Sequence, residues 1–330
     1  MVKRALSFAV ACAAAFVGLS LPATPAAAQD FPNKPVRIFV PLGPGSAFDI
    51  FARAMGEEFK ARTGQPFVVE NRPGGNQIVT GNALKGADAD GYTIALFTQS
   101  GISLNPLLQA KLSYDPYKDF APVAVVALTQ QVFVVTPLPG VNKFADLVEY
   151  SQGHPNTLNF ATLGPGSDGD LTLLWLKQQT GGNWAHVPYR GSPPILAALK
   201  AGQVHMTLLT YGSLKAHIDS GAVKPLFVRG SDKRSPALPD VPIYEETGLP
   251  PLDVTAWAGI FAPAGTPPAA LKKLNQEIMA IVNDPKFRTR FMDQPGLLPV
   301  SVKLEDIPAF LAKDRDAWGR LVKATGVQPK

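Results

Sequence analysis

A glycine-rich loop stands between a predicted strand over 36–40 and a predicted helix over 49–63. Glycines let the backbone approach a ligand closely, and the free N–H groups at a helix start attract an anion. A simple tight turn would use the same residue types, and that interpretation stays open. The candidate binding residues of this segment are Gly43, Gly45, Ser46, Ala47, Phe48 and Asp49.

A second glycine-rich loop, at 164–170, stands between a predicted strand over 158–162 and a predicted helix over 170–180. Asp170 fits a helix N-cap or a first-turn acid, which the helix dipole stabilises. Asp168 is harder to explain, because a carboxylate facing a ligand carboxylate costs energy unless an amine, a hydroxyl or a proton lies between them. The candidate binding residues here are Thr162, Gly166, Ser167 and Asp168.

Further candidates follow from the rule that ligands of open α/β sheets bind beyond the carboxyl ends of the strands. The residues that end or follow other predicted strands are Thr98, Gln99, Ser100, Tyr189 and Thr210. Their hydroxyl and amide groups would hydrogen-bond the polar end of a ligand. Tyr189 could instead pack in the core with a satisfied hydroxyl, and Phe48 could pack in the core at the start of its helix.

Patterns that would indicate catalysis do not occur in this sequence. Four histidines are present, and no two of them have the short spacing of a zinc motif. The stretch Gly164–Ser167 lacks the glycine of a nucleophile elbow two places after the serine, since Gly169 comes one residue late. The first loop is not a full dinucleotide fingerprint. The sequence therefore predicts no enzyme, no cofactor and no metal site.

The length of 330 residues suits two domains of ordinary size. Hydrophobic residues make up 46% and charged residues 17%, as in ordinary globular proteins. The formal net charge of +5 falls to +3 when Lys3 and Arg4 are removed. This charge is too small and too evenly spread to suggest a nucleic-acid partner.

The first 28 residues have the pattern of a secretory signal peptide. Lys3 and Arg4 precede an uncharged apolar run, and three alanines end at Ala28 as a cleavage site. A membrane anchor is the alternative, although the run is short for a bilayer span. Cys12, the only cysteine, lies inside this segment, so the mature chain would have no disulfide and no thiolate site. We expect a mature periplasmic protein that begins at Gln29.

Strand and helix patterns alternate along the rest of the chain, which favours mostly parallel sheets with helices on both faces. Strands are predicted at 36–40, 67–70, 92–97, 123–135, 158–162, 186–189, 204–209, 223–228 and 256–261. Helices are predicted at 49–63, 144–151, 170–180, 194–201, 213–220, 268–282, 285–292 and 307–325.

The long apolar stretch 123–135 looks like a strand that leaves one sheet and enters another. The middle of the chain, 132–228, would form lobe 2, and the two ends, 29–131 and 229–330, would together form lobe 1. The predicted hinge consists of two crossover segments near 121–135 and 223–230. No internal repeat is predicted.

An ordered series of motifs resembles the Bug-type, TctC-like binding proteins of tripartite tricarboxylate transporters. The stretches that carry this resemblance are FPNKPVRIFVP at 31–41, VVENRPGGN at 68–76, DGYTIAL at 90–96, YDPYKDFAPV at 114–123, HVPYRGSPP at 186–194, AGQV at 201–204, KRSPALPDVP at 233–242 and FAPAGTP at 261–267. They cover nearly the whole mature chain.

The resemblance implies an α/β fold of the two-lobed periplasmic-binding-protein type (type II-like), with two crossover hinge segments. It also implies a small organic carboxylate as ligand and the permease subunits of a membrane transporter as partners. The two glycine-rich loops would then face each other across the cleft like pincers. We expect a monomer. A periplasmic receptor that signals to a two-component system, without transport, is the alternative.

The sequence departs from the family pattern at several cleft positions. Asp168 replaces a residue that is usually neutral, and Ile102 and Leu209 stand where polar residues are common. Together with Phe48 they would make the cleft less polar. We therefore expect a monocarboxylate with an apolar or aromatic body and a hydrogen-bond donor at its far end, which Asp168 would accept.

Overall fold

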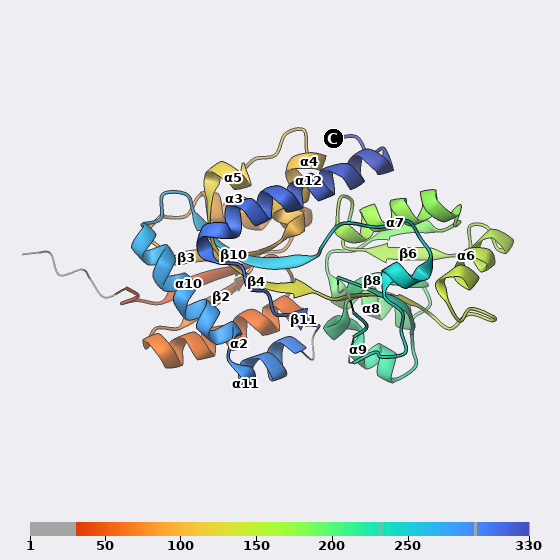
Figure 1. The fold of residues 1–330 in the computed structure, drawn as a ribbon, viewed down its shortest axis with the longest axis horizontal. Coiled ribbons are helices and arrows are strands. Elements are labelled where there is room, and N and C mark those ends of the chain that lie inside the picture. Colours follow the sequence, from red (N-terminus) through yellow and green to blue (C-terminus); the bar gives the residue numbers. More distant parts are fainter. Residues whose placement is uncertain (1–30, 231–232, 236, 294–295, 330) are drawn as a thin grey trace, which may run out of the picture.

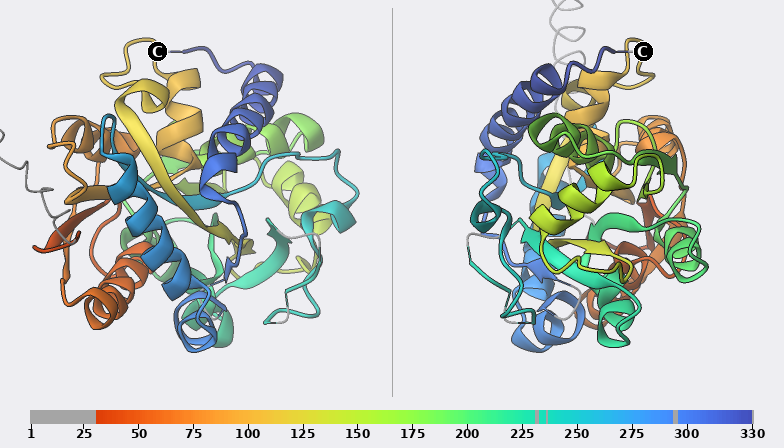
Figure 2. Two further views of the ribbon diagram at one scale, coloured as in Figure 1. Left: turned by 60° about the vertical axis from the view of Figure 1, so that its left-hand side comes forward. Right: turned by 90° about the vertical axis from the view of Figure 1, so that its right-hand side faces the viewer.

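The computed structural model describes residues 31–329, except 231, 232, 236, 294 and 295. The predicted signal peptide, 1–28, lies outside the described residues. The described chain forms two lobes, each built on one β-sheet with helices packed against its faces (Figures 1 and 2). We call the lobe of the six-stranded sheet the first lobe and that of the five-stranded sheet the second lobe.

The sheet of the first lobe has the strand order β11-β4-β10-β3-β1-β2. These strands are β1 Val36–Val40, β2 Phe67–Asn71, β3 Thr93–Thr98, β4 Phe120–Thr129, β10 Trp257–Pro263 and β11 Leu297–Leu298. β1 pairs in parallel with β2 and β3, whereas β10 runs antiparallel to β3 and β4. β11 is antiparallel to β4.

The sheet of the second lobe has the strand order β7-β6-β8-β5-β9. These strands are β5 Gln131–Val135, β6 Asn159–Thr162, β7 Ala185–Pro188, β8 Met206–Thr210 and β9 Lys224–Arg229. β6 is parallel to β7 and β8, whereas β5 is antiparallel to β8 and β9.

The α-helices of the described chain are α2 Ala47–Thr63, α3 Ile78–Lys85, α4 Asn105–Leu108, α5 Pro116–Asp119, α6 Phe144–Gly153, α7 Asp168–Thr180, α8 Ser192–Lys200, α9 Tyr211–Asp219, α10 Pro268–Val282, α11 Pro285–Arg288 and α12 Ile307–Thr325. Two of them, α10 and α12, have the bounds predicted from the sequence. The predicted helix over 285–292 is α11 followed by a π-helical turn, Thr289–Asp293. The short helix α3 is not among the predicted elements.

The predicted two-lobed α/β fold is confirmed, but both sheets are mixed rather than mostly parallel. The chain leaves the first lobe through β4 and β5 and returns to it through β9 and β10. Because an outgoing strand and a returning strand run in opposite directions, β9 is antiparallel to β5 and β10 is antiparallel to β4. Strand patterns alone carry no information on this direction.

The strands change sheets between Thr129 and Gln131, and again between Arg229 and Trp257. The second passage is long, and its residues Tyr244, Leu252 and Val254 join the core of the second lobe. The lobe bounds and the two hinge segments given above stay predictions, because they concern rigid-body motion.

The C-terminal helix α12 is a further link between the lobes and runs along one side of both (Figure 1). Near its start, Ile307 and Leu311 pack in a core cluster of the first lobe. Near its end, Trp318 and Leu321 pack in a core cluster of the second lobe. The helix α12 therefore packs against both lobes and not against the first lobe alone.

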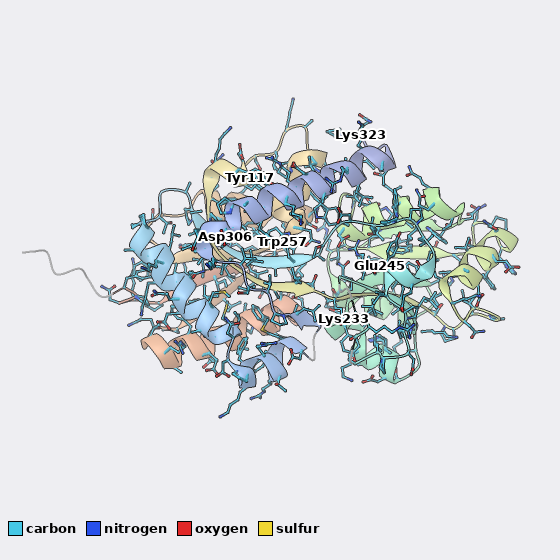
Figure 3. The ribbon with its side chains drawn as sticks, in the orientation of Figure 1. Tyr117, Lys233, Glu245, Trp257, Asp306 and Lys323 are labelled. Carbon is cyan, nitrogen blue, oxygen red and sulfur yellow. The ribbon has the colours of Figure 1, made fainter. Side chains whose placement is uncertain are left out.

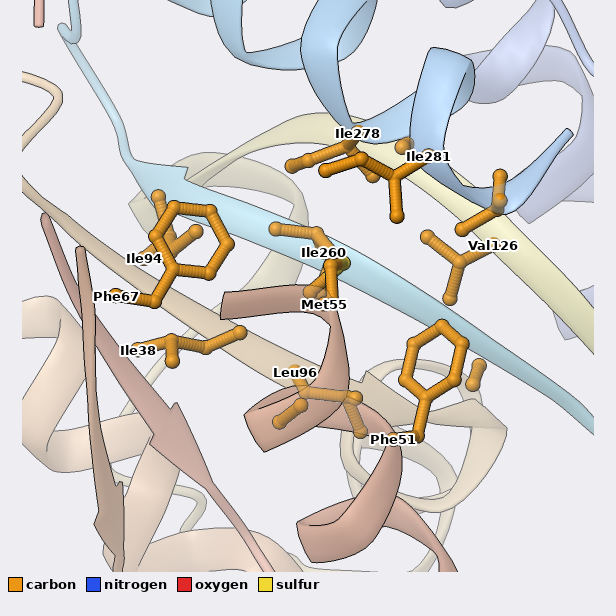
Figure 4. Close-up of a cluster of buried hydrophobic side chains, with 14 of the residues drawn as sticks. Ile38, Phe51, Met55, Phe67, Ile94, Leu96, Val126, Ile260, Ile278 and Ile281 are labelled. Atoms are coloured by element: carbon orange, nitrogen blue, oxygen red, sulfur yellow. The ribbon is translucent and has the colours of Figure 1, made fainter. Parts of the chain in front are cut away.

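The first sheet is buried on both faces, as the continuous apolar character of its strands requires. In β3, Ile94 and Leu96 point to the cluster covered by α2 and α10, whereas Ala95 and Phe97 point to the opposite cluster. Figure 4 shows Phe51 and Met55 of α2 packed in the first of these clusters. Each such side chain contributes about 1.5–3 kcal/mol when it is fully buried. These layers hold the carboxyl ends of the strands, and the loops that follow them, in fixed positions.

Candidate ligand-binding site

A cavity of about 510 Å³ lies between the two lobes. Loops after β1, β2 and β3 form one wall, and loops after β6, β7 and β8 form the other. Each of these strands presents its carboxyl end to the cavity, as expected for open α/β sheets. Thr129 and Gln131, where the chain first crosses between the sheets, also line it.

The loop before α2 is a tight turn that ends in a helix cap. The N–H of Ser46 donates to the carbonyl of Gly43 at 3.3 Å, and Gly45 has φ +78°, a conformation that favours glycine. Ser46 is the N-cap of α2, and its hydroxyl accepts from the N–H of Asp49 at 3.3 Å. The carboxylate of Asp49 accepts from the N–H of Gly45 at 2.9 Å.

The loop before α7 repeats this arrangement residue for residue. The N–H of Ser167 donates to the carbonyl of Gly164 at 3.1 Å, and Gly166 has φ +75°. The hydroxyl of Ser167, the N-cap of α7, accepts from the N–H of Asp170 at 3.3 Å. Asp170 accepts from the N–H of Gly166 at 2.8 Å. Asp170 is thus a first-turn acid, one of its two predicted roles.

Both loops carry the same sequence, Gly-Pro-Gly-Ser-x-x-Asp, at 43–49 and 164–170. This short internal repeat is visible in the sequence, and it corrects the prediction that the chain has no internal repeat. It explains why two helices of different lobes begin with the same geometry at the same cavity. The first N–H groups of α2 and α7 belong to residues that line the cavity, namely Ala47, Phe48, Asp168 and Gly169. Two positive helix ends therefore border one cavity, which favours an anionic ligand.

Asp49 holds the first loop in place through its hydrogen bond with Gly45. It is 4% exposed and also accepts hydrogen bonds from Arg53 at 3.0 Å and from Asn71 at 2.9 Å. Burial alone would raise the pKa of Asp49, but these hydrogen bonds, with that from Gly45, outweigh it and hold the pKa below its usual value. Asp49 is therefore ionised, and its carboxylate is bound by donors within the protein rather than free for a ligand.

Asp168 does not present a free carboxylate to the cavity, which corrects the expectation from the sequence. The side chain lines the cavity but is only 4% exposed. Both of its oxygens accept from Nη2 of Arg229. One oxygen also accepts from Gln99 at 3.1 Å and the other from Thr172 at 3.2 Å. The N-cap of α7 is Ser167 and not Asp168.

A third loop, which follows β2, reaches the cavity from the first lobe. Four successive residues, Gly74 to Gln77, have positive φ angles, from 49° at Asn76 to 134° at Gly74. Nδ2 of Asn76 donates to the carbonyl of Gly166 in the second lobe at 3.0 Å, and Nε2 of Gln77 donates to Thr98. The loop thus contributes to the cavity wall and to a contact between lobes.

Of the residues predicted from the sequence, ten line the cavity: Ser46, Ala47, Phe48, Thr98, Gln99, Ser100, Ser167, Asp168, Tyr189 and Thr210. The other five do not border it, namely Gly43, Gly45, Asp49, Thr162 and Gly166. Gly43, Gly45 and Gly166 shape the turns, and Asp49 holds one of them. Thr162 is buried, and its hydroxyl contacts Nε2 of His186 at 2.5 Å and the N–H of Gly164 at 3.1 Å.

Several lining residues were not predicted as binding residues. They are chiefly Gly74, Gly75, Asn76, Gln77, Gln109, Gln131, Arg190, Ser192 and Ser213. The carboxyl-end rule, applied also to β2 and extended beyond Tyr189 after β7, would have found the loops at 73–78 and 188–192. Leu209 lines the cavity as expected, but Ile102 is fully buried in the first lobe and does not.

Two further observations concern the described part of the chain. No group of three or more His, Cys, Asp or Glu side chains among these residues is placed to hold a metal ion. None of the helices there has the length and apolar character needed to cross a membrane.

Comparison with known proteins gives the family. Residues 51–327 match the model of the tripartite tricarboxylate transporter family receptor. The chain belongs to this family. It is thus a binding receptor and not an enzyme, which agrees with the resemblance seen in the sequence.

Related proteins support this assignment along the whole chain. Protein BugT of Bordetella pertussis is 29% identical to the receptor over 320 residues, which cover 96% of each chain. Rpa4515 of R. palustris, solved with adipate, has a TM-score of 0.86 and 30% identity, covering 91% of this chain and all of that one. MatC of Rhodopseudomonas palustris, solved with bound malate, has a TM-score of 0.81 and 28% identity, covering 88% of this chain and 100% of that one.

Proposed function

We propose that this receptor binds a small organic mono- or dicarboxylate in the cavity between its lobes and delivers it to a tripartite tricarboxylate-type membrane transporter. In this proposal the receptor works in the periplasm as a monomer, after a signal peptide has been removed at Ala28. The relatives solved with adipate and with malate support a carboxylate as ligand.

The observation that carries the proposal is the pair of matched Gly-Pro-Gly-Ser-x-x-Asp loops. They put the starts of α2 and α7, from different lobes, at the same cavity. Backbone N–H groups at a helix start bind a carboxylate without a charged side chain. A ligand that contacts both loops also holds the two lobes together, which couples binding to closure.

The cavity suits a small organic acid in size and in polarity. Its volume of about 510 Å³ lies within the range of sites for small molecules. Hydroxyl and amide groups alternate with apolar side chains such as Phe48, Leu163 and Leu209. These apolar groups would pack against the carbon chain of the ligand, while its carboxylate contacts the loops.

The test is a panel of mono-, di- and tricarboxylates, each paired with its neutral amide, measured by thermal shift and then by calorimetry. A bound ligand adds RT ln(1 + [L]/Kd) to the free energy of unfolding. We expect at least one carboxylate to bind and its amide not to bind. If no acid of the panel binds more tightly than its amide, the proposed ligand class is wrong.

One substitution tests the helix-start N–H groups directly. Ala47→Pro removes one of these donors at the first helical position, where proline is well tolerated. Ser46 already has the extended conformation, φ −70° and ψ 158°, that a residue before proline adopts. Ala47→Ser is the matched control, because it keeps the N–H. We expect Ala47→Pro to weaken carboxylate binding about tenfold with little change in stability, and Ala47→Ser to bind nearly as wild type.

The cellular part of the proposal has its own measurements. N-terminal sequencing of the periplasmic protein should begin at Gln29, and full-length protein retained in membranes would contradict export with cleavage. Deletion of the gene should abolish uptake of the ligand found in the panel. Uptake that persists while a transcriptional response is lost would favour the sensor role instead.

A further inference from the structure

Arg229, the last residue of β9, forms a buried ion pair with Asp168 next to the cavity. Arg229 is 2% exposed and is not among the residues that line the cavity, whereas Asp168, its partner, is. The guanidinium also donates to Thr172 at 2.9 Å and to the side chain of Gln131, which lines the cavity. Asp168 therefore stands between a fixed positive charge and the space where a ligand would bind.

The acceptor positions of Asp168 are largely occupied from within the protein. One nitrogen of Arg229 contacts both carboxylate oxygens, and Gln99 and Thr172 each donate to one of them. Because Asp168 is also only 4% exposed, little of its carboxylate is left for a donor on the ligand. The role expected from the sequence, selection of a ligand with an amine or hydroxyl at its far end, is therefore not supported.

The pair instead resembles a carboxylate ligand already bound to its arginine. A guanidinium fits a carboxylate by shape and by charge, and a buried arginine needs such a partner. We propose that Asp168 is a specificity-determining residue that acts as a fixed counter-ion: its carboxylate takes the place that a ligand carboxylate would take at Arg229. By doing so it keeps a second or third anionic group away from the second-lobe wall. This inference rests on the proposed function, since it concerns the charge of the same ligand.

Removal of the Asp168 carboxylate should turn this wall into an anion site. Asp168→Ser leaves space beside Arg229 that opens to the cavity, because Asp168 itself lines it. Acetate is small enough to fill that space, and tricarballylate can reach it with one of three carboxylates. The control is Asp168→Ser with Arg229→Gln, which has the same space but no guanidinium. Wild type is the second control.

The first measurement is thermal unfolding in sodium acetate and in sodium chloride at equal ionic strength. We expect acetate to raise the melting temperature of Asp168→Ser by about 2 °C for each tenfold increase above its Kd. Wild type and the double variant keep only the helix-start N–H groups, so their melting temperatures should respond less to acetate than that of Asp168→Ser. An equal response of Asp168→Ser and the double variant would overturn the proposal.

The second measurement is calorimetry with tricarballylate. Asp168→Ser should bind it about tenfold or more tightly than wild type does, since one charge-assisted pair is gained. The double variant should not gain. If Asp168→Ser does not fold in either salt, Asp168→Ala, which leaves the same space beside Arg229, is used for the same titration, and no gain there would refute the counter-ion role.

These results separate this inference from the proposed function. If wild type binds no carboxylate of the panel, the proposed function fails, whereas the acetate response of Asp168→Ser can still appear. If wild type binds carboxylates but the variant gains no anion affinity, the proposed function stands and the role of Asp168 is wrong.

Discussion

Gln99 of the first lobe donates a hydrogen bond from Nε2 to Oδ2 of Asp168 in the second lobe, at 3.1 Å. The same amide is held from its other side, because its Oε1 accepts from the backbone N–H of Trp257 at 3.2 Å. Trp257 lies in the middle of the molecule, at the start of the returning strand β10 (Figure 3). One buried side chain thus joins the sheet of the first lobe to helix α7 of the second lobe beside the cavity.

We expect Gln99→Glu to destabilise the receptor by about 3 kcal/mol at pH 7. The change removes a hydrogen bond to a charged group and brings a second carboxylate to Asp168 in a site that is 4% exposed at residue 99. Urea unfolding measures the effect. Gln203→Glu, at an exposed position of the second lobe, is the matched control and should change the free energy of unfolding by less than about 0.5 kcal/mol. Equal midpoints for the two variants would show that the link carries no energy.

Asp314 of α12 gives a prediction on pH. Burial raises the pKa of Asp314 to about 6, although a hydrogen bond from Ser103 at 2.5 Å opposes this rise, and the nearby carboxylate of Asp168 adds to it. The unfolded chain loses this proton near pH 3.8, the ordinary value. Between these two values the folded state binds more protons than the unfolded state, so stability falls as pH rises.

The fall should amount to about 2 kcal/mol between pH 4 and pH 7, since one pKa unit corresponds to about 1.4 kcal/mol and the unfolded group is already mostly ionised at pH 4. Asp314→Asn should remove this part of the pH dependence and be more stable than wild type at pH 7. Asp316→Asn, on the exposed side of the same helix, should leave the pH profile unchanged. Urea unfolding from pH 4 to pH 7 is the measurement, and parallel profiles for wild type and Asp314→Asn would contradict it.

The sequence predicts the strands and long helices well because burial on both faces and helical spacing leave clear patterns. It does not predict α3, where Thr80, Gly81 and Asn82 interrupt the apolar pattern. The structure gives the reason for this glycine: a Cβ there would lie 2.3 Å from the ring of Tyr114. A close approach between segments that are distant in the sequence leaves no recognisable pattern in the residues around Gly81.

In the site, too, local features can be predicted from the sequence and contacts between distant segments cannot. The two glycine-rich loops are predictable, because turn residues and a capping serine act over a few residues along the chain. The pairing of Asp168 with Arg229 is not, because Arg229 lies 61 residues away at the end of a strand expected only to be part of a hinge. The sequence therefore showed an unusual acid in the cleft but could not show that it was neutralised.

The last prediction concerns Asn76, whose φ of 49° is strained for a residue other than glycine. Its Nδ2 donates across the lobes to the carbonyl of Gly166 at 3.0 Å and also to Oδ1 of Asn105 at 3.1 Å. Asn76→Gly relieves the backbone strain, worth about 1 kcal/mol, but the added freedom of the unfolded chain offsets about as much. What remains is the loss of the side-chain hydrogen bonds.

Because the bond to Gly166 exists only when the lobes are together, its loss should lower the population of the closed state and so weaken ligand binding. We expect about fivefold weaker binding of a carboxylate found in the panel, the equivalent of one neutral hydrogen bond of about 1 kcal/mol. Asn156→Gly is the matched control: Asn156 has φ 63° and is exposed in a turn of the second lobe. It should bind as wild type does. If calorimetry gives the same affinity for both glycine variants, the contact of Asn76 with Gly166 does not contribute to closure, and the strained loop after β2 serves only to shape the cavity wall.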